Sequence, residues 1–221
     1  MSGLRLPGRL RALACVLALA AGALTTAGMS GTAMAAVTAP LVAAPEIGVQ
    51  FNADGDAGQC GGTTGQQWAA SPDWTQAIRF DTDNRAGGCQ LAFGVYDPDG
   101  TLAGASITYT FLPSSGGNAG QCGDYQGTYG MPIQTFRTFG QAVRVDTDSR
   151  PGWCDLTFTV SGRSDVGLDV QFYPDGDAGQ CVNYLPQGQY RTAYAGNPVT
   201  VGIDADGRSG GCQFLLRVRH F

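Results

Sequence analysis

The chain of 221 residues contains no lysine, one histidine and one glutamate. A serine hydrolase triad needs a histidine, and His220 is the penultimate residue, where packing of the chain end is the more ordinary role. The G-x-S-x-G motif of a nucleophilic serine is absent. With Glu46 the only glutamate, a two-carboxylate glycosidase would have to rely on aspartates, and these recur in turns. The sequence therefore predicts a protein that is not an enzyme.

Long hydrophobic runs are also missing. The longest apolar segment, from about Leu13 to Leu24, has about a dozen residues, whereas a membrane-spanning helix needs roughly 20. Arginines at positions 5, 9 and 11 precede it, and Ala33-Met34-Ala35 follows it. This order is typical of a secretory signal peptide. We therefore expect residues 1–35 to be a signal peptide and the remainder to be secreted to the extracellular space, without a membrane anchor.

Positive charge becomes scarcer once that segment is set aside. Three of the 13 basic residues lie in it and no acidic residue does, which leaves ten arginines against 18 acidic residues and a formal charge of −8. Because nucleic-acid binding depends on a basic face that meets the phosphates, we expect no nucleic-acid partner. The lack of lysine beside abundant alanine, glycine and arginine suits a GC-rich bacterial genome.

The chain does contain an internal repeat. A motif that reads D-x-D-x-R-x-G-x-C occurs at 81–89, 146–154 and 204–212, and the tetrapeptide Ala-Gly-Gln-Cys precedes each copy. The matching cysteines recur with a period of about 60 residues. These spacings predict three β-repeats, at residues 47–103, 104–166 and 167–221, after an extended N-terminal arm at residues 36–46.

The cysteines follow the same repeat. Cys15 lies in the predicted signal peptide, and the other six form an even set, which suits disulfides in an exported protein. A zinc site would need closely spaced cysteines and histidines, which the chain lacks. Each disulfide within a repeat would close a loop of about 30 residues and stabilise the fold by roughly 3 to 4 kcal/mol. The predicted pairs are Cys60 with Cys89, Cys122 with Cys154 and Cys181 with Cys212.

Each repeat contains three short segments in which apolar and polar residues alternate, as in a half-buried strand. No long segment has the 3.6-residue period of a helix. We expect an all-β fold, a compact pseudo-threefold body in which the repeats share one core, as in β-trefoil or β-prism lectins. The alternative is three small β-sandwiches in tandem, and the short connections at 97–105 and 161–167 favour packed repeats. The nine predicted strands are 47–51, 77–81, 90–96, 107–111, 142–146, 156–160, 168–172, 199–203 and 214–218.

Pairs of aspartates spaced D-x-D are candidates for calcium, because two carboxylates in one loop can converge on a hard cation. The pairs before the Ala-Gly-Gln-Cys cysteine are Asp54 with Asp56 and Asp175 with Asp177, whereas the second repeat has Gly116-Gly117-Asn118. The repeat fold therefore does not require the first pair. The alternative is structural: aspartate accepts backbone N–H bonds in a turn, and glycine supplies positive φ. The glutamine beside each cysteine either bonds a buried backbone group or contacts a ligand.

Aromatic residues follow each of these cysteines in Gly-rich polar loops, where flat rings can stack against sugars while amides and carboxylates meet the hydroxyls. In the alternative, these rings fill the core. We expect a lectin-like, carbohydrate-binding protein whose partner is an extracellular glycan. The second hypothesis is a protein-binding adaptor in a secreted assembly or toxin complex, or an inhibitor of a secreted enzyme. The candidate ligand-binding residues are Trp68, Trp74, Tyr125, Tyr129, Tyr184 and Tyr190.

Overall fold

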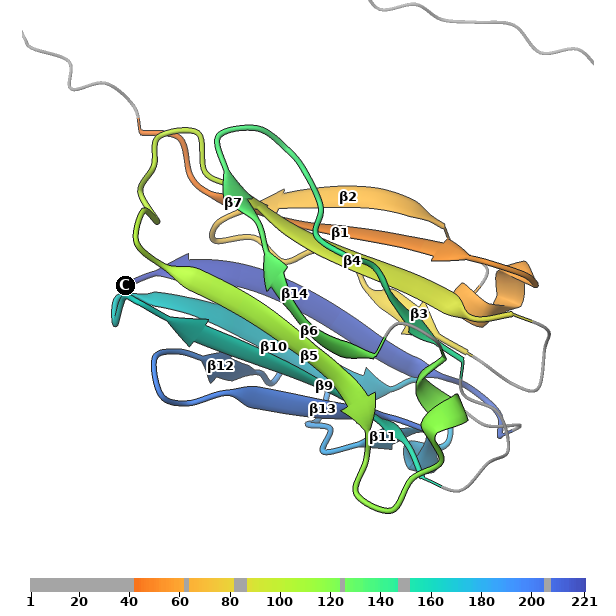
Figure 1. Ribbon diagram of the computed structural model, residues 1–221. Coiled ribbons are helices and arrows are strands. Elements are labelled where there is room, and N and C mark those ends of the chain that lie inside the picture. The colour runs from red at the N-terminus through yellow and green to blue at the C-terminus, as the bar shows by residue number, and fades with distance from the viewer. Residues whose placement is uncertain (1–41, 62–63, 82–86, 124–125, 147–151, 205–207) are drawn as a thin grey trace, which may run out of the picture. The chain divides into compact units, whose positions relative to one another are not determined.

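The computed structural model describes residues 42–221 apart from 62–63, 82–86, 124–125, 147–151 and 205–207 (Figure 1). The predicted signal peptide, most of the N-terminal arm, and Tyr125 lie outside the described residues. Within the part that is described, no helix is long and apolar enough to cross a membrane. Residues Leu41–Phe221 form one compact unit.

The described residues form strands and three short 3-10 helices, so the all-β class is confirmed. The first repeat contains β1 (Glu46–Ala53), η1 (Ala57–Cys60), β2 (Gly65–Ala70), β3 (Ile78–Phe80) and β4 (Cys89–Tyr96). The second contains β5 (Ser106–Pro113), η2 (Ala119–Cys122), β6 (Gly127–Met131), β7 (Ile133–Gln134), β8 (Val143–Val145) and β9 (Cys154–Ser161). The third contains β10 (Val166–Pro174), η3 (Ala178–Gln180), β11 (Cys181–Val182), β12 (Arg191–Ala193), β13 (Val199–Ile203) and β14 (Cys212–His220).

A strand lies at each of the nine segments where alternation predicts one. In β9, for example, Leu156, Phe158 and Val160 are fully buried while the residues between them are only partly covered. Strands β2, β6, β7, β11 and β12 were not expected, because short segments such as Gln66-Gln67-Trp68 have no clear alternation of apolar and polar residues. They form edge strands in which only one side is covered, so their register depends on the strand beside them.

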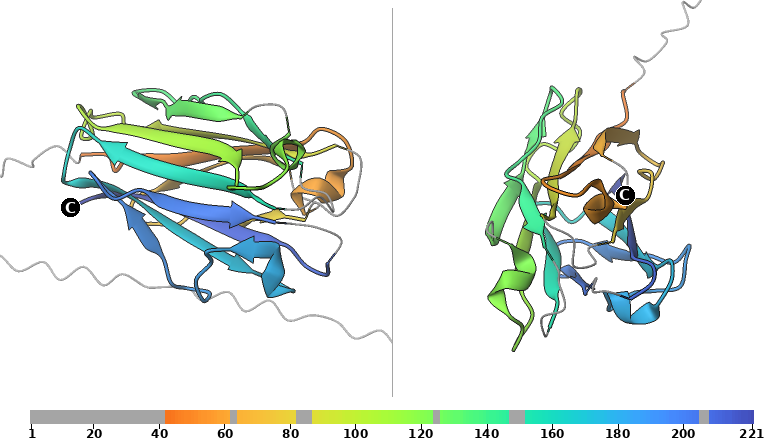
Figure 2. Two further views of the ribbon diagram at one scale, coloured as in Figure 1. Left: turned by 60° about the horizontal axis from the view of Figure 1, so that its bottom comes forward. Right: turned by 90° about the vertical axis from the view of Figure 1, so that its right-hand side faces the viewer.

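The strands form three sheets, and each sheet combines strands of two repeats. Within a repeat, the first strand lies antiparallel between the second and the last, as in β2-β1-β4. The remaining strand leaves its own repeat: β3 pairs with β14, β8 pairs with β4, and β13 pairs with β9. The first repeat therefore gives β3 to the third, the second gives β7 and β8 to the first, and the third gives β13, with β11 beside it, to the second. Figure 2 shows the three sheets around a common interior.

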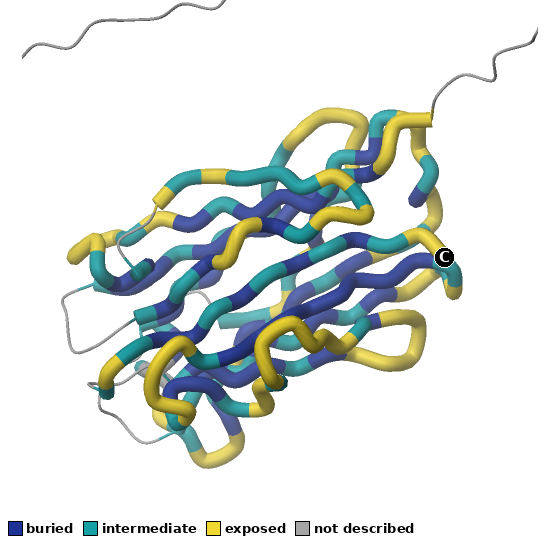
Figure 3. Tube along the Cα trace, turned by 180° about the vertical axis from the view of Figure 1, so that it is seen from behind, coloured by how far each residue is buried: buried dark blue, intermediate teal, exposed yellow. Residues whose placement is uncertain are grey.

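The inner faces of the sheets form one hydrophobic cluster that contains residues of all three repeats. Phe93, Phe158 and Phe214, one from each repeat, contact one another with ring centroids 5.4, 5.7 and 6.1 Å apart. All three side chains are fully buried. Exposed residues concentrate in the loops (Figure 3).

Three disulfides join the predicted pairs of cysteines, with Cα atoms 5.2 to 5.7 Å apart. In the first two repeats each disulfide ties the end of a 3-10 helix to the start of the last strand, as Cys60 in η1 is tied to Cys89 in β4. All six cysteines are buried. Disulfides of this kind form and persist in an oxidising environment.

Candidate functional site

Two of the predicted tryptophans, Trp68 and Trp74, line the same pocket at the edge of the first sheet. Trp68 comes from β2 and Trp74 from the segment that connects β2 to β3. The pocket has a volume of about 260 Å³ and opens to solvent. Its lining is formed by Gln67, Trp68, Ala69, Ala70, Asp73, Trp74, Thr75 and Gln76.

Hydrogen bonds fix the shape of the segment between the two tryptophans. The side-chain amide of Gln67 donates to the Gln76 carbonyl at 3.1 Å, and its oxygen accepts from the Gln76 N–H at 2.7 Å. Buried Thr75 bonds to Leu216 of β14 through its own N–H, at 2.9 Å, and through its hydroxyl, at 3.0 Å. These bonds hold the β2–β3 connection between two sheets, so the pocket is formed before any ligand arrives.

The ring of Trp68 lies over a glycine of the neighbouring strand. Gly48 in β1 pairs with Trp68, and a Cβ atom at Gly48 would lie 2.5 Å from the ring. On the same surface the ring of Phe139 is 5.0 Å from Trp68, centroid to centroid, and the Arg137 guanidinium is 5.8 Å from the Trp68 centroid. Glu46 binds Arg137 at 2.7 Å. Trp68 is thus held on the outer face of the sheet.

Trp74 is in contact with the third repeat. The Arg217 guanidinium of β14 lies over the Trp74 ring at 4.3 Å, and Tyr190 meets the ring edge-on at 5.5 Å. Arg217 is in turn held by Asp169 of β10, which is fully buried and 2.5 Å from the guanidinium. The Thr192 hydroxyl also donates to Asp169, at 2.6 Å. The contact with Arg217 fixes the orientation of Trp74, and part of its ring remains exposed to the pocket.

The other aromatic candidates do not join this pocket. Tyr129 packs against the core, 5.9 Å from Tyr109, and its hydroxyl donates to the Gln126 carbonyl. Tyr184 is exposed on the third repeat. Tyr190 is linked to the pocket only through its contact with Trp74. The structure therefore brings together Trp68 and Trp74, places Tyr190 beside them, and leaves Tyr129 and Tyr184 elsewhere.

Sequence analysis did not identify Asp73, Gln67 or Phe139 as neighbours of the tryptophans. Asp73 lies one residue before Trp74, and this proximity is the one signal that could have found it. Phe139 belongs to the second repeat, and its contact with Trp68 depends on the pairing between repeats. No spacing within one repeat shows such a contact.

The first aspartate of each candidate calcium pair is bonded to an arginine of another repeat. Asp54 accepts from the Gly88 N–H at 2.6 Å, from Gln90 at 3.2 Å and from Arg144 of β8 at 2.5 Å. Asp175 has the same three kinds of partner: the Gly211 N–H at 2.7 Å, Gln213 at 3.0 Å and Arg79 of β3 at 2.6 Å. The two arginine bonds connect neighbouring repeats, whereas the other bonds join two turns of the same repeat.

The second aspartate of each pair caps a 3-10 helix. The Asp56 carboxylate accepts from the Gly58 N–H at 2.7 Å, and Asp177 does the same for Gly179. In the second repeat Asn118 makes this bond to Gly120. Within the described residues there is no group of three or more His, Cys, Asp or Glu side chains arranged to hold a metal ion. Calcium binding stays a prediction that these contacts do not test.

The third junction between repeats replaces the ion pair with an aromatic contact. Ser114 makes the bonds to Trp153 that Asp54 makes to Gly88 and Asp175 makes to Gly211, although it lies two residues further from Ala-Gly-Gln-Cys than they do. Gly202 in β13 stands where the other two junctions have arginine. Trp153 occupies the space above Gly202, where a Cβ atom would lie 2.6 Å from the indole. The indole N–H donates to Asp155 at 2.9 Å. Four positions have thus changed together, which shows that the ion pair and the tryptophan fill the same place.

The ion pairs make stability sensitive to acid. Partial burial acts to raise the pKa of Asp54, but the bonds from Arg144, the Gly88 N–H and Gln90 outweigh it, and the pKa lies below 3.8. The pKa of Asp175 is lowered in the same way. A lowered pKa means that the stabilisation is complete well above 3.8 and is lost as the pH falls toward the folded-state pKa.

We therefore expect the Asp54→Asn variant to be less stable than the wild type by about 1–3 kcal/mol at neutral pH. When the pH is lowered from about 5 to about 2, the stability of the variant should fall by less than that of the wild type. Urea unfolding at several pH values measures both effects. Asp56→Asn is the matched control, since the second repeat already has asparagine at that cap. If the stability of Asp54→Asn depended on pH as strongly as that of the wild type, the Asp54 ion pair would not be the source of the acid sensitivity.

The buried glutamine of the repeat has a structural role in the third copy. Gln180 is fully buried, and its side-chain amide donates to the Arg208 carbonyl at 2.6 Å and to the Gly210 carbonyl at 3.2 Å. It therefore ties the Ala-Gly-Gln-Cys turn to the D-x-D-x-R-x-G-x-C turn.

His220 lies at the end of β14, 3.1 Å from Asp165 and 3.0 Å from Arg163.

Comparison of the chain with protein-family models, with curated proteins and with solved structures finds no match. The function is therefore argued from the pocket itself.

Proposed function

We propose that this protein is a secreted, non-catalytic carbohydrate-binding protein and that the Trp68–Trp74 pocket is its glycan site. The observation that carries the proposal is that two tryptophans, one from edge strand β2 and one from the segment after it, line one open pocket together with Asp73, Gln67 and Gln76. Rings of this kind bury the apolar C–H face of a sugar, and amides and carboxylates accept or donate to its hydroxyls.

The polar groups of the pocket differ in what they can offer a sugar. The Asp73 side chain is exposed and is an acceptor for two hydroxyls. The Gln67 side-chain amide bonds to the Gln76 backbone, which fixes the position of its remaining donor and acceptor groups. This arrangement suits a neutral sugar with vicinal hydroxyls. These polar groups can bind sugar hydroxyls without a metal ion, so calcium is not part of the proposed site.

Three further parts of the proposal concern the whole molecule. The signal-peptide pattern and the three disulfides support secretion, and the composition supports a bacterial origin. The cyclic exchange of β3, β8 and β13 supports a pseudo-threefold arrangement of the repeats. The pocket belongs to the first repeat, with Trp74 stabilised by the third, so the repeats would differ in binding.

The proposal is tested by retention on insoluble cellulose, chitin and xylan and by a glycan array, each with and without chelator. We expect Trp68→Ala and Asp73→Ala to weaken binding at least about tenfold, which corresponds to about 1.4 kcal/mol. Tyr184→Ala is the matched control, because this tyrosine is exposed but lies outside the pocket. Urea unfolding of each variant separates lost binding from lost folding. Binding that is unchanged in both pocket variants would exclude this site.

A second function is favoured by a different surface. Tyr184, Tyr190 and Tyr194 are exposed on the third repeat, and Phe221 lies beside Arg219 there. Tyrosine and arginine are enriched where protein partners bind. The alternative is therefore a protein-binding adaptor or an inhibitor of a secreted enzyme. Recovery of one stoichiometric protein from culture supernatant, lost in Tyr184→Ala and Tyr194→Ala, with no glycan retained, would support it.

A further inference from the structure

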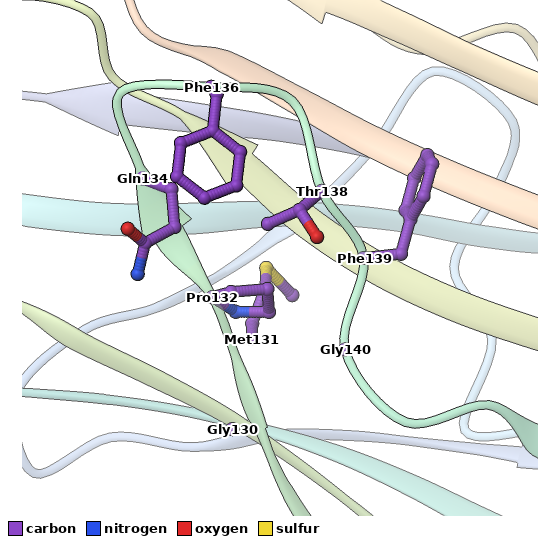
Figure 4. Close-up of a pocket in the computed structure, with 8 residues that line it drawn as sticks. All are labelled: Gly130, Met131, Pro132, Gln134, Phe136, Thr138, Phe139 and Gly140. Carbon is purple, nitrogen blue, oxygen red and sulfur yellow. The ribbon is translucent and has the colours of Figure 1, made fainter.

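A second pocket lies beside the Trp68–Trp74 pocket, under the segment that connects β7 to β8. It has a volume of about 410 Å³ and is lined mainly by apolar side chains. Figure 4 shows the connecting segment as an arch, with Phe136 at its top and Met131 and Pro132 between its two arms. Phe136 is 61% exposed, whereas Met131 is buried. An exposed phenylalanine above a buried floor forms an apolar surface open to solvent.

The arch is fixed at its base, so the second pocket does not depend on a ligand for its shape. The Gly140 N–H donates to the Phe93 carbonyl of β4 at 2.9 Å, and the buried Tyr109 hydroxyl donates to the Gln141 carbonyl. On the other arm, the N–H groups of Val95 and Asp97 donate to the carbonyls of Pro132 and Gln134, both at 2.8 Å. Both arms are therefore bonded to the first sheet or the core.

The two pockets meet on the outer face of the first sheet. Gly48 and Gly94 are directly opposite each other on β1 and β4, and both lack a side chain on this face. The Trp68 ring lies over Gly48, and the backbone of Thr138 passes close over Gly94. Phe139, which lines the second pocket, contacts Trp68, which lines the first. The two pockets therefore share one aromatic contact, that between Trp68 and Phe139. Trp74 lies in the first pocket and Phe136 in the second.

We infer that the two pockets form one binding surface and that its ligand is an oligosaccharide chain, with one end at Trp68 and Trp74 and the other under Phe136. This inference rests on the proposed function. Aromatic rings along a groove suit successive sugar units, since every pyranose ring has an apolar face. The Arg137 guanidinium, which lies over the Trp68 ring at 5.8 Å, is already paired with Glu46, and this neutralised charge favours an uncharged chain. Thr138 and Gln134 supply polar groups at the second pocket.

The dependence of affinity on chain length tests the inference. The probes are soluble cello-, chito- and xylo-oligosaccharides of one to six units, titrated by calorimetry against the full chain with its disulfides intact. For the series that binds, we expect affinity to rise at least about tenfold from the dimer to the hexamer. Phe136→Ala should remove most of that rise and leave dimer affinity within about twofold of wild type. Trp68→Ala should weaken the binding of both the dimer and the hexamer.

Phe221→Ala is the matched control, because Phe221 is also a phenylalanine that is 61% exposed but lies outside both pockets. It should leave the whole series unchanged. An affinity that is level beyond the dimer, or a hexamer affinity unaffected by Phe136→Ala, would overturn the inference while the glycan site at Trp68 stands. Absence of binding to every oligosaccharide, together with no retention on the three polysaccharides, would overturn the proposed function and the inference with it.

Discussion

The Asp169→Ala variant is expected to lose about 3–5 kcal/mol of its free energy of unfolding. Asp169 is fully buried, while the side chain of Arg217, 2.5 Å away, is 16% exposed. Arg219 lies 3.5 Å from the same carboxylate. Removing Asp169 leaves Arg217 charged, mostly buried and without the carboxylate that compensates it. The Thr192 hydroxyl also loses its acceptor.

Urea unfolding at neutral pH measures this loss. Asp165→Asn is the control, because Asp165 also binds an arginine, Arg163, at 2.5 Å, but its side chain is 43% exposed. Exposed ion pairs contribute little because solvent screens them, so the control should lose much less stability than Asp169→Ala. Since Arg217 also holds Trp74, the Asp169 variant should show a changed tryptophan emission spectrum before it unfolds. Equal losses in the two variants would show that burial is not the cause.

Reduction of all three disulfides is expected to remove cooperative folding at ambient temperature. Each closes a loop of similar length, with sequence separations of 29, 32 and 31 residues, and each contributes about 3–4 kcal/mol by chain entropy. Together they contribute roughly 10 kcal/mol, which is comparable to the whole stability of a typical domain, about 5–15 kcal/mol. Circular dichroism in urea, with and without reductant, measures the effect.

A single disulfide gives the corresponding graded test. The double variant Cys60→Ala/Cys89→Ala removes one loop closure and should keep a cooperative transition that is weaker by about 3–4 kcal/mol. A reduced protein that unfolds within about 1 kcal/mol of the oxidised one would show that the shared core, and not the cross-links, supplies the stability. The small repeats make this outcome unexpected, because a unit of about 60 residues buries only a modest core.

The strands and disulfides were predictable because their signals are local. Alternation in Leu156-Thr157-Phe158 fixes a strand and its buried face, and the repeated cysteines fix the pairs. Strand β2 was missed because it is an edge strand with no fully buried residue, so its sequence carries no alternation of apolar and polar residues. Its position depends on β1, which lies beside it in the sheet.

The candidate site could be predicted only in part. The composition of the loop after Cys60 pointed to Trp68 and Trp74, and these do share a pocket. The contacts of Trp74 with Tyr190 and Arg217 join residues more than 100 positions apart, and no pattern within one repeat contains them. Asp169 stands between Leu168 and Val170 and therefore has the pattern of an exposed polar residue. Its burial results from the arginines and Thr192 that cover that face of the sheet.

The exchange of strands between repeats has a consequence for the order of folding. Strand β3 is near the start of the described chain, and its partner β14 is at the end, so the sheet that contains both closes only when nearly the whole chain is available. Each of the other two sheets also waits for a later repeat. Folding should therefore be slow, as expected for a chain dominated by distant contacts, and should finish only when nearly the whole chain is available. A chain that still lacks its third repeat would leave the unpaired edge of β9 open to other strands.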